Sequence, residues 1–314
     1  MKISFRKLIP LVAAIGMTFA GAAHADVVAQ NGVGSAFNLK NGAGTTIVNG
    51  ATSLDWNQQG SGVAKGVGPF SSSNLLPVGA GFEFLYQANL TSVGGGTATA
   101  ALRDLDTTSN GSLDAGFDAN TAFEFTIVAR LNEVVTASTL VGNNPTSNFG
   151  LGAGSNKVAI YYDKNANSNT ATGTGFDDGV LIALLTIVQD GTTSQFSAVA
   201  GTTTGQGSAR LHATIDAANG DFINSAYLSG VTDMLFGINF ESTLNYPANS
   251  ADTSGFHIGG DGRFGDYTVG ANDIVFKVDG SNSFTNVPEP GSMMLMGLGM
   301  LGLVGAARRK SKKA

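Results

Sequence analysis

Glycine recurs along almost the whole chain, usually beside Asn, Asp, Ser or Thr. There are 44 glycines among 314 residues, about twice the share usual in proteins. Each glycine inside a helix costs about 1 kcal/mol relative to alanine, whereas Asn-Gly and Asp-Gly pairs favour tight turns. The sequence therefore excludes a mainly helical fold and predicts short strands joined by turns. Among others, we expect turns at residues 110–111, 190–191, 219–220 and 279–280.

Apolar and polar residues alternate with a period of two in many segments, most clearly in residues 81–91 and 122–132. This period is typical of strands with one buried face. Residues 180–188 are apolar on both faces and fit either a central strand or a short buried helix, but their β-branched residues favour the strand. Residues 216–228 could hold one short helix. We expect further strands at residues 157–163, 180–189, 194–200, 209–215, 233–241 and 273–279.

The spacing of these strands indicates the fold class. No helical segments separate them and no repeat of fixed period is visible, which favours an antiparallel β-sandwich or jelly roll over a parallel α/β sheet. We therefore predict one all-β domain at residues 26–284. The chain has no Cys. Disulfides and thiolate metal sites are thus excluded, and the domain has to be stabilised by its core.

The first 25 residues have the three parts of a secretory signal peptide. A basic start is followed by an apolar stretch and by small residues before the expected cleavage point. We predict that signal peptidase cuts residues 1–25 from the chain between Ala25 and Asp26. A membrane anchor is the alternative, but the apolar stretch is short for a span and contains Pro10.

Three features follow one another at the end of the chain. They are the triplet Pro288, Glu289 and Pro290 in a linker at 285–290, the uncharged residues 291–307, and the basic residues 308–314, which begin with Arg308 and Arg309. The uncharged segment reaches the lower length limit of a transmembrane helix, and the positive-inside rule keeps the basic tail in the cytoplasm. We expect an extended linker, a short transmembrane helix and an exported domain.

These C-terminal residues resemble the PEP-CTERM sorting signal of Gram-negative bacteria that make exopolysaccharide. The resemblance implies that an exosortase, a membrane cysteine peptidase, recognises the signal and removes or replaces the tail. It also implies a transient anchor in the inner membrane and a final location at the cell surface or in the extracellular matrix. A plain C-terminal membrane anchor is the alternative.

A second resemblance covers much of the exported region. Residues 56–62, 82–88, 161–163, 173–179 and 273–276 are similar to the flocculation-associated PEP-CTERM proteins. Membership would imply a secreted structural or adhesive protein that helps cells to aggregate in their exopolysaccharide matrix. It would bring no catalytic residue.

The exported region is strongly acidic. Between residues 26 and 287 there are 22 acidic and nine basic residues, a formal charge of −13. A nucleic-acid-binding surface needs the opposite charge to neutralise phosphates, so the sequence excludes this class of partner. Cations or neutral polysaccharide are expected instead.

Two segments carry oxygen-bearing side chains at alternate positions, as calcium-binding loops do. The first has Asp106, Thr108, Asn110 and Asp114, with Gly111 at the sixth position, but it lacks an acidic residue at the twelfth. An Asx-rich surface turn is the alternative for this segment.

The second segment has Asp163, Asn165 and Asn167, with Asp177 and Asp178 downstream. Its sixth position is not glycine and only one of its first three candidate ligands is charged, so we expect low affinity. A hairpin loop is the alternative here. Calcium is the one cofactor that the sequence suggests.

Catalytic motifs are not found, and we expect no enzymatic activity. Carboxylates brought together by the fold could still form the pair that cleaves polysaccharide, so a polysaccharide-active enzyme remains an alternative. A carbohydrate-binding module is another, because Trp56 lies beside Asn57, Gln58 and Gln59 and could stack on a sugar ring. A single tryptophan is more often part of the core.

Overall fold

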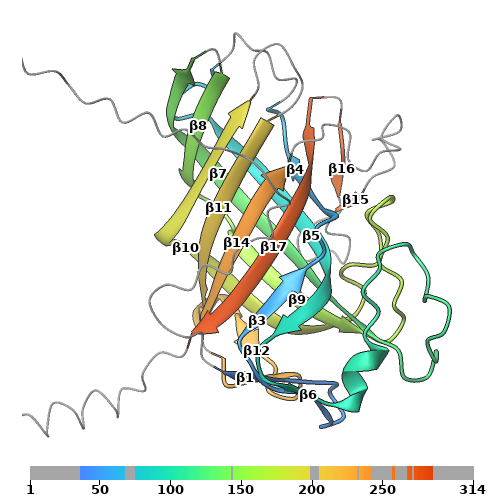
Figure 1. Ribbon diagram of the computed structural model, residues 1–314. Helices are drawn as coiled ribbons and strands as arrows, with labels where there is room; N and C mark the ends of the chain where they lie inside the picture. The colour runs from blue at the N-terminus through green and yellow to red at the C-terminus, as the bar shows by residue number, and fades with distance from the viewer. Residues whose placement is uncertain are drawn as a thin grey trace, which may run out of the picture.

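The computed structural model describes residues 36–67, 75–142, 144–198, 205–231, 233–241, 257–258, 267–270 and 272–285 (Figure 1). In these residues almost all regular structure is antiparallel sheet. Helical structure in the described ranges is limited to two short 3-10 helices, η1 (Ala100–Asp104) and η2 (Ala217–Asn219). The prediction of an all-β antiparallel fold is confirmed.

The main sheet has eleven strands. It consists of β3 (Ser53–Trp56), β4 (Gly60–Ala64), β5 (Gly81–Gly94), β7 (Glu124–Val141), β8 (Asn144–Leu151), β9 (Lys157–Asp163), β10 (Val180–Ala198), β11 (Gly205–Thr214), β12 (Phe222–Ile223), β14 (Asp233–Glu241) and β17 (Ile274–Thr285). Strand β5 pairs with β4 and β7, and β7 pairs with both β8 and β9. Strands β8 and β9 both pair with β10. Across the sheet, β10 pairs with β11, β11 with β14, and β14 with β17. Strand β17 in turn pairs with β3 and β4. The sheet therefore closes on itself, and its long strands have partners on both edges.

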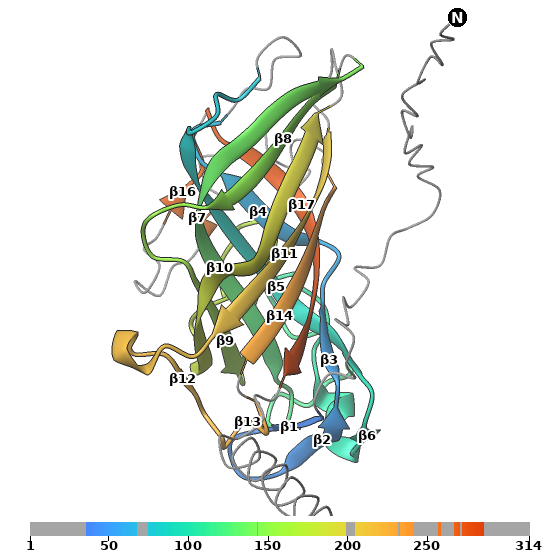
Figure 2. The ribbon, with the colours of Figure 1, turned by 90° about the vertical axis from the view of Figure 1, so that its left-hand side faces the viewer.

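Two small sheets accompany the main one. The first consists of β1 (Phe37–Lys40), β2 (Thr46–Ala51), β6 (Thr97–Ala98) and β13 (Leu228–Ser229), and it lies at the lower end of the closed sheet (Figure 2). The second is formed by β15 (His257–Ile258) and β16 (Tyr267–Thr268).

The interior of the closed sheet is filled by alternate side chains of its strands. Phe84 of β5, Phe196 of β10 and Phe276 of β17 all belong to one buried cluster. The ring of Phe276 lies 6.3 Å from that of Phe84 and 5.3 Å from that of Phe196, measured between centroids. Side chains from strands that are not neighbours in the sheet thus pack together in its interior, and each buried aromatic or aliphatic side chain contributes about 1.5–3 kcal/mol.

The outer face of the sheet is also covered where β9 and β10 meet. Phe176, from the loop at residues 164–179, packs against a cluster that includes Leu184 of β10. On the same strand, Ile182 faces the interior. Residues 180–188 are therefore apolar on both faces because both faces are buried, and the strand prediction for them is confirmed.

Two predicted turns are wrong. Asp190 and Gly191 lie inside β10, which runs for 19 residues through both strands expected there. The pairing of β10 with β11 shifts register at this point, and Gly191 has a φ of 75°, so the pair forms a bulge instead of a hairpin. Asp279 and Gly280 lie inside β17 and pair with β14. The turns predicted at residues 110–111 and 219–220 contain glycines with positive φ, as expected.

Candidate functional site

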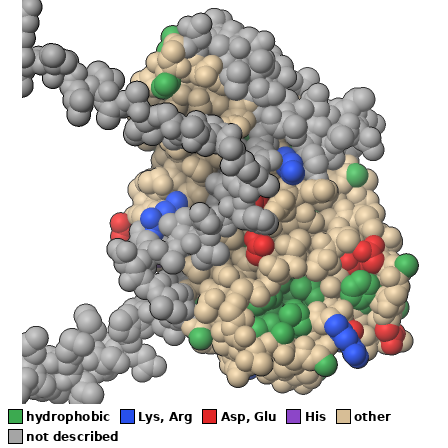
Figure 3. Space-filling view, viewed as in Figure 1, with side chains coloured by type: hydrophobic (Ala, Val, Ile, Leu, Met, Phe, Trp, Pro, Cys, Tyr) green, Lys and Arg blue, Asp and Glu red, His purple; other side chains and the backbone are tan. Residues whose placement is uncertain are grey.

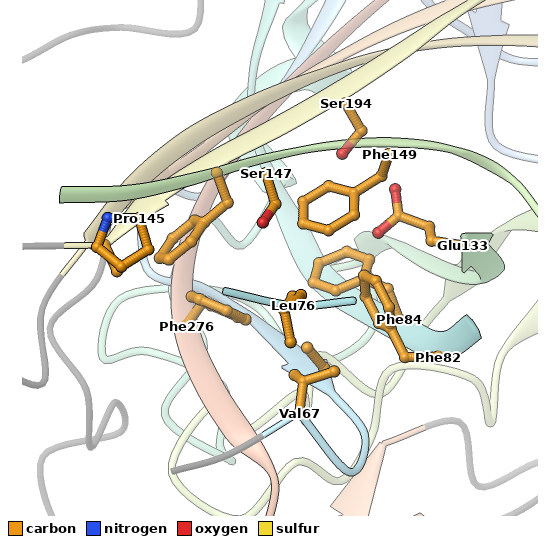
Figure 4. Close-up of a pocket in the computed structure, with 13 residues that line it drawn as sticks. Val67, Leu76, Phe82, Phe84, Glu133, Pro145, Ser147, Phe149, Ser194 and Phe276 are labelled. Atoms are coloured by element: carbon orange, nitrogen blue, oxygen red, sulfur yellow. The ribbon is translucent and has the colours of Figure 1, made fainter. Parts of the chain in front are cut away.

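An apolar pocket lies at the end of the closed sheet where β8 is found, at the top of Figure 1 (Figure 4). Its cavity volume is about 40 Å³, and it is open to solvent. Five phenylalanine rings dominate the wall, and one carboxyl group interrupts it. The lining residues are Ala64, Val67, Leu76, Phe82, Phe84, Glu133, Pro145, Ser147, Phe149, Ser194, Phe196, Ala198 and Phe276.

Glu133 is the one charged residue in the lining of this pocket. Its side chain is buried beside Ser194 and Phe149 (Figure 4). Burial raises the pKa of Glu133 to about 7, although a hydrogen bond with Ser194 acts in the opposite direction. Near neutral pH this carboxyl can therefore donate as well as accept a hydrogen bond. An apolar wall with one such group is the arrangement that small-ligand pockets use.

A second glutamate with a raised pKa, Glu124, begins the same strand β7. Burial raises the pKa of Glu124 to about 7, against the hydrogen bonds that it receives from Ser168 and Asn167. Glu124 and Glu133 are nine residues apart, about 30 Å along a strand. The carboxyl groups of a glycosidase pair lie about 5–10 Å apart, so these two do not form one.

Trp56 is not available for stacking on a sugar. Its exposed fraction is 0%, and its indole Nε1 donates a 2.8 Å hydrogen bond to Oδ1 of the buried Asn282. The predicted carbohydrate contact at Trp56 is therefore wrong, and the residue is part of the core. The physical reason is that β3 joins the closed sheet between β5 and β17, with the indole facing inward.

The first predicted calcium loop uses its oxygens within itself. The Asp106 carboxylate accepts hydrogen bonds from the backbone N–H and hydroxyl of Thr108 and from the backbone N–H of Asp114. Asn110 accepts from Ser112 and donates to the Asp114 carboxylate at 2.9 Å. These contacts are those of an Asx-rich turn, the alternative that the sequence left open.

The second predicted calcium loop is held by hydrogen bonds to Glu124, the first residue of β7. The Glu124 carboxylate accepts from the backbone N–H groups of Asn167 and Ser168 at 2.7 and 2.9 Å, and from the Ser168 hydroxyl at 2.5 Å. Asn165 is exposed, and its backbone N–H donates to Oδ1 of Asp163. The Asn167 side-chain amide donates to the Asp178 carboxylate at 3.1 Å.

The two predicted loops lie side by side, which the sequence did not indicate. Gly111 and Thr170 donate backbone hydrogen bonds across the contact to Ser168 and Ser109. Glu124 was also missed as a site residue, because its alternating pattern marked it only as the polar face of a strand. Within the described residues no group of three or more His, Cys, Asp or Glu side chains is placed to hold a metal ion. A cation here would depend on amide and backbone oxygens as well as carboxylates.

Comparison with known protein families gives a match at the end of the chain. Residues 286–310 match the family of the PEP-CTERM protein-sorting motif. The chain carries a PEP-CTERM sorting signal. This PEP-CTERM protein is therefore exported and sorted by an exosortase toward the cell envelope or surface. No match was found among curated proteins or among solved structures.

The match contains all five residues predicted to form the sorting signal, which are Pro288, Glu289, Pro290, Arg308 and Arg309. Like the predicted signal peptide with its cleavage point at Ala25 and Asp26, they lie outside the described residues. Within the described part of the PEP-CTERM protein, no helix has the length and apolar character needed to cross a bilayer.

Proposed function

We propose that this PEP-CTERM protein is a structural or adhesive protein of the cell surface or extracellular matrix, where it supports cell aggregation in exopolysaccharide. The observation that carries the proposal is the sorting signal at residues 286–310, which directs the chain to the envelope. A transient inner-membrane anchor, formed by residues 291–307 and removed by the exosortase, is part of the proposal.

The fold and charge of the domain support this role. A sheet with paired edges resists pairing with other chains, so contacts with a matrix would be made by side chains and end loops. Separate acidic and basic side chains lie on a largely uncharged surface (Figure 3). The domain has a net negative charge and would repel anionic polymers at low salt. Neutral polysaccharide or bridging cations are therefore the expected partners.

The flocculation-associated family remains part of the proposal. Two of the segments that resemble it lie in strands of the closed sheet: residues 82–88 in β5 and residues 161–163 at the end of β9. These two segments are part of the wall of the sheet, so the resemblance would reflect a shared scaffold.

A second candidate function is a carbohydrate-binding module, or an enzyme acting on polysaccharide, that uses the phenylalanine-lined pocket. The observation that favours it is the single carboxyl of Glu133 among five aromatic rings. Aromatic faces can stack on sugar rings while a carboxyl binds a hydroxyl group.

Deletion of the gene, followed by measurement of floc size and settling, tests the main proposal. We expect dispersed cells in the deletion strain and restored flocs when the intact gene is returned. Normal flocs in the deletion strain would refute the aggregation role.

Complementation with Glu133→Gln or Phe149→Ala separates the two candidates. Both residues line the pocket. Restored flocs with either variant would favour the structural role alone. Loss of flocs, with the variant protein exported at the normal level, would favour recognition of a ligand in the pocket. Calorimetric titration of the purified protein with oligosaccharides from the matrix would then identify binding directly.

A further inference from the structure

Two oxygen atoms, one at the end of β9 and one in the loop that follows it, are buried without a hydrogen-bond donor. They are Oδ2 of Asp163 and Oδ1 of Asn167. Asp163 has an exposed fraction of only 8%. A buried carboxylate oxygen without a hydrogen-bond donor lowers the stability of the folded protein, so a positive group at this place would be stabilising.

The carboxyl group of Asp178 faces the same place. The Asp178 carboxylate accepts a hydrogen bond from the Asn167 side-chain amide at 3.1 Å, so it lies beside that side chain. The carboxyl groups of Asp163 and Asp178 interact electrostatically, and a cation between them would offset their mutual repulsion. The ion pairs among the described residues involve neither Asp163 nor Asp178.

Two glycines let the loop backbone pass close to the side chains of Asn167 and Asp163. A side chain at Gly175 would place its Cβ 2.5 Å from Oδ1 of Asn167, and one at Gly179 would place its Cβ 2.9 Å from that of Asp163. The Glu124 carboxylate holds the backbone of Asn167 by accepting a hydrogen bond from its N–H at 2.7 Å. Only glycine fits at these two close approaches, so the two glycines keep the backbone close to both side chains.

We propose that Asp163, Asn167 and Asp178 bind a calcium ion. Carboxylate and amide oxygens are hard ligands, and calcium accepts them in irregular geometry together with backbone carbonyls and water. Asp178 is exposed, so the ion can enter from solvent. Asn165, the other candidate of this loop, contributes its backbone N–H to Asp163. Two carboxylates give low charge, which corresponds to a dissociation constant of about 0.1–1 mM, the range of extracellular calcium modules.

The ion would also hold the β9–β10 loop against the sheet. That loop carries Phe176, which covers Leu184, and it contacts the Asx-rich loop at residues 106–114 through Ser168. Calcium binding should therefore raise the thermal stability of the whole domain, because the loop is part of its buried surface.

Thermal unfolding of the purified exported protein tests this inference. We expect 10 mM CaCl2 to raise the melting temperature by about 3–5 °C over the protein in EDTA. Sodium chloride at equal ionic strength should have no such effect, and MgCl2 should have much less. Isothermal titration with CaCl2 should show about one site per chain. An absence of binding heat and of any stabilisation at 10 mM, or an equal effect of MgCl2, would overturn the proposal.

Variants identify the site. Asp178→Asn removes the repulsion with Asp163, so it should fold at least as well as the wild type and lose the calcium shift. Asn167→Asp adds a charged ligand and should increase the shift. Asp114→Asn, in the neighbouring loop, is the matched control and should respond as the wild type does. A normal calcium shift in Asp178→Asn, or its loss in Asp114→Asn, would contradict the assignment.

Discussion

Single side chains decide whether polar groups inside the closed sheet are satisfied, and Trp56 is the clearest case. Substituting Trp56→Phe keeps an aromatic ring but removes the donor to Asn282. The smaller ring leaves a gap and an acceptor without a partner. We expect the free energy of unfolding to fall by about 2 kcal/mol, measured by urea denaturation followed by circular dichroism.

The matched control for this substitution is an exposed aromatic residue. Phe222 in β12 is 38% exposed, and Phe222→Leu should change the free energy of unfolding by less than about 0.5 kcal/mol. Equal stability of the two variants would contradict the importance of the buried indole.

Glu133 gives the pocket a dependence on pH. Its pKa is about 7 in the folded protein and 4.5 in its ordinary state, so the folded protein binds the proton more tightly. The stability that this group contributes is complete below about pH 4.5 and is lost as pH rises to about 7. We expect Glu133→Gln to remove this loss, worth up to about 3 kcal/mol.

The measurement compares the free energy of unfolding of wild type and Glu133→Gln between pH 4.5 and 8. Glu124 has a raised pKa of similar size, so part of the pH dependence should persist in the variant. If the difference between the two proteins does not grow with pH, the carboxyl of Glu133 is not buried as described.

At the scale of the strand, the bulge in β10 depends on one glycine. Gly191 has a φ of 75°, a conformation that costs a side-chain-bearing residue about 1–2 kcal/mol. Space is not the obstacle, because a Cβ would lie 3.6 Å from the nearest atom of His212. Gly191→Ala should therefore lower the free energy of unfolding by about 1 kcal/mol, and Gly191→Asn by less, in urea denaturation.

Gly81 provides the control for backbone strain. It lies at the start of β5, and a Cβ there would meet the Glu133 carbonyl at an ordinary 3.6 Å. Gly81→Ala should leave the stability unchanged or slightly higher. A similar loss at Gly81 and Gly191 would mean that the positive φ is not the cause.

The positions of the strands could be predicted from sequence, but the roles of some turns could not. Alternation located β5 and β7 because one face of each is buried and the other is polar. Asp-Gly pairs at 190–191 and 279–280 predicted hairpins, since a local pattern cannot distinguish a turn from a bulge in a long strand. That distinction depends on pairing with β11 and β14, which lie far along the chain.

At the scale of the whole molecule, closure of the sheet decided which predicted site residues came together. The sequence named Asp163, Asn167 and Asp178 as candidate calcium ligands, but the hydrogen bond between Asn167 and Asp178 depends on how the loop between β9 and β10 folds. The pocket was not predicted, because its phenylalanines come from β5, β8, β10 and β17 and meet only in the closed sheet. Local patterns carry no information on such contacts between distant strands.

The sorting signal, in contrast, is local and was fully readable from sequence. Replacing Pro288, Glu289 and Pro290 by alanine changes residues beyond β17, which ends at Thr285. The folded domain should therefore keep its melting temperature, while the exosortase loses its recognition sequence. We expect the variant to accumulate uncleaved in the membrane fraction, detected by cell fractionation and by the mass of the intact chain.

Replacing Ser281 and Ser283, which lie inside β17, should instead lower the melting temperature and leave processing of folded protein unchanged. Normal release of the alanine variant would show that the triplet does not direct sorting in this protein.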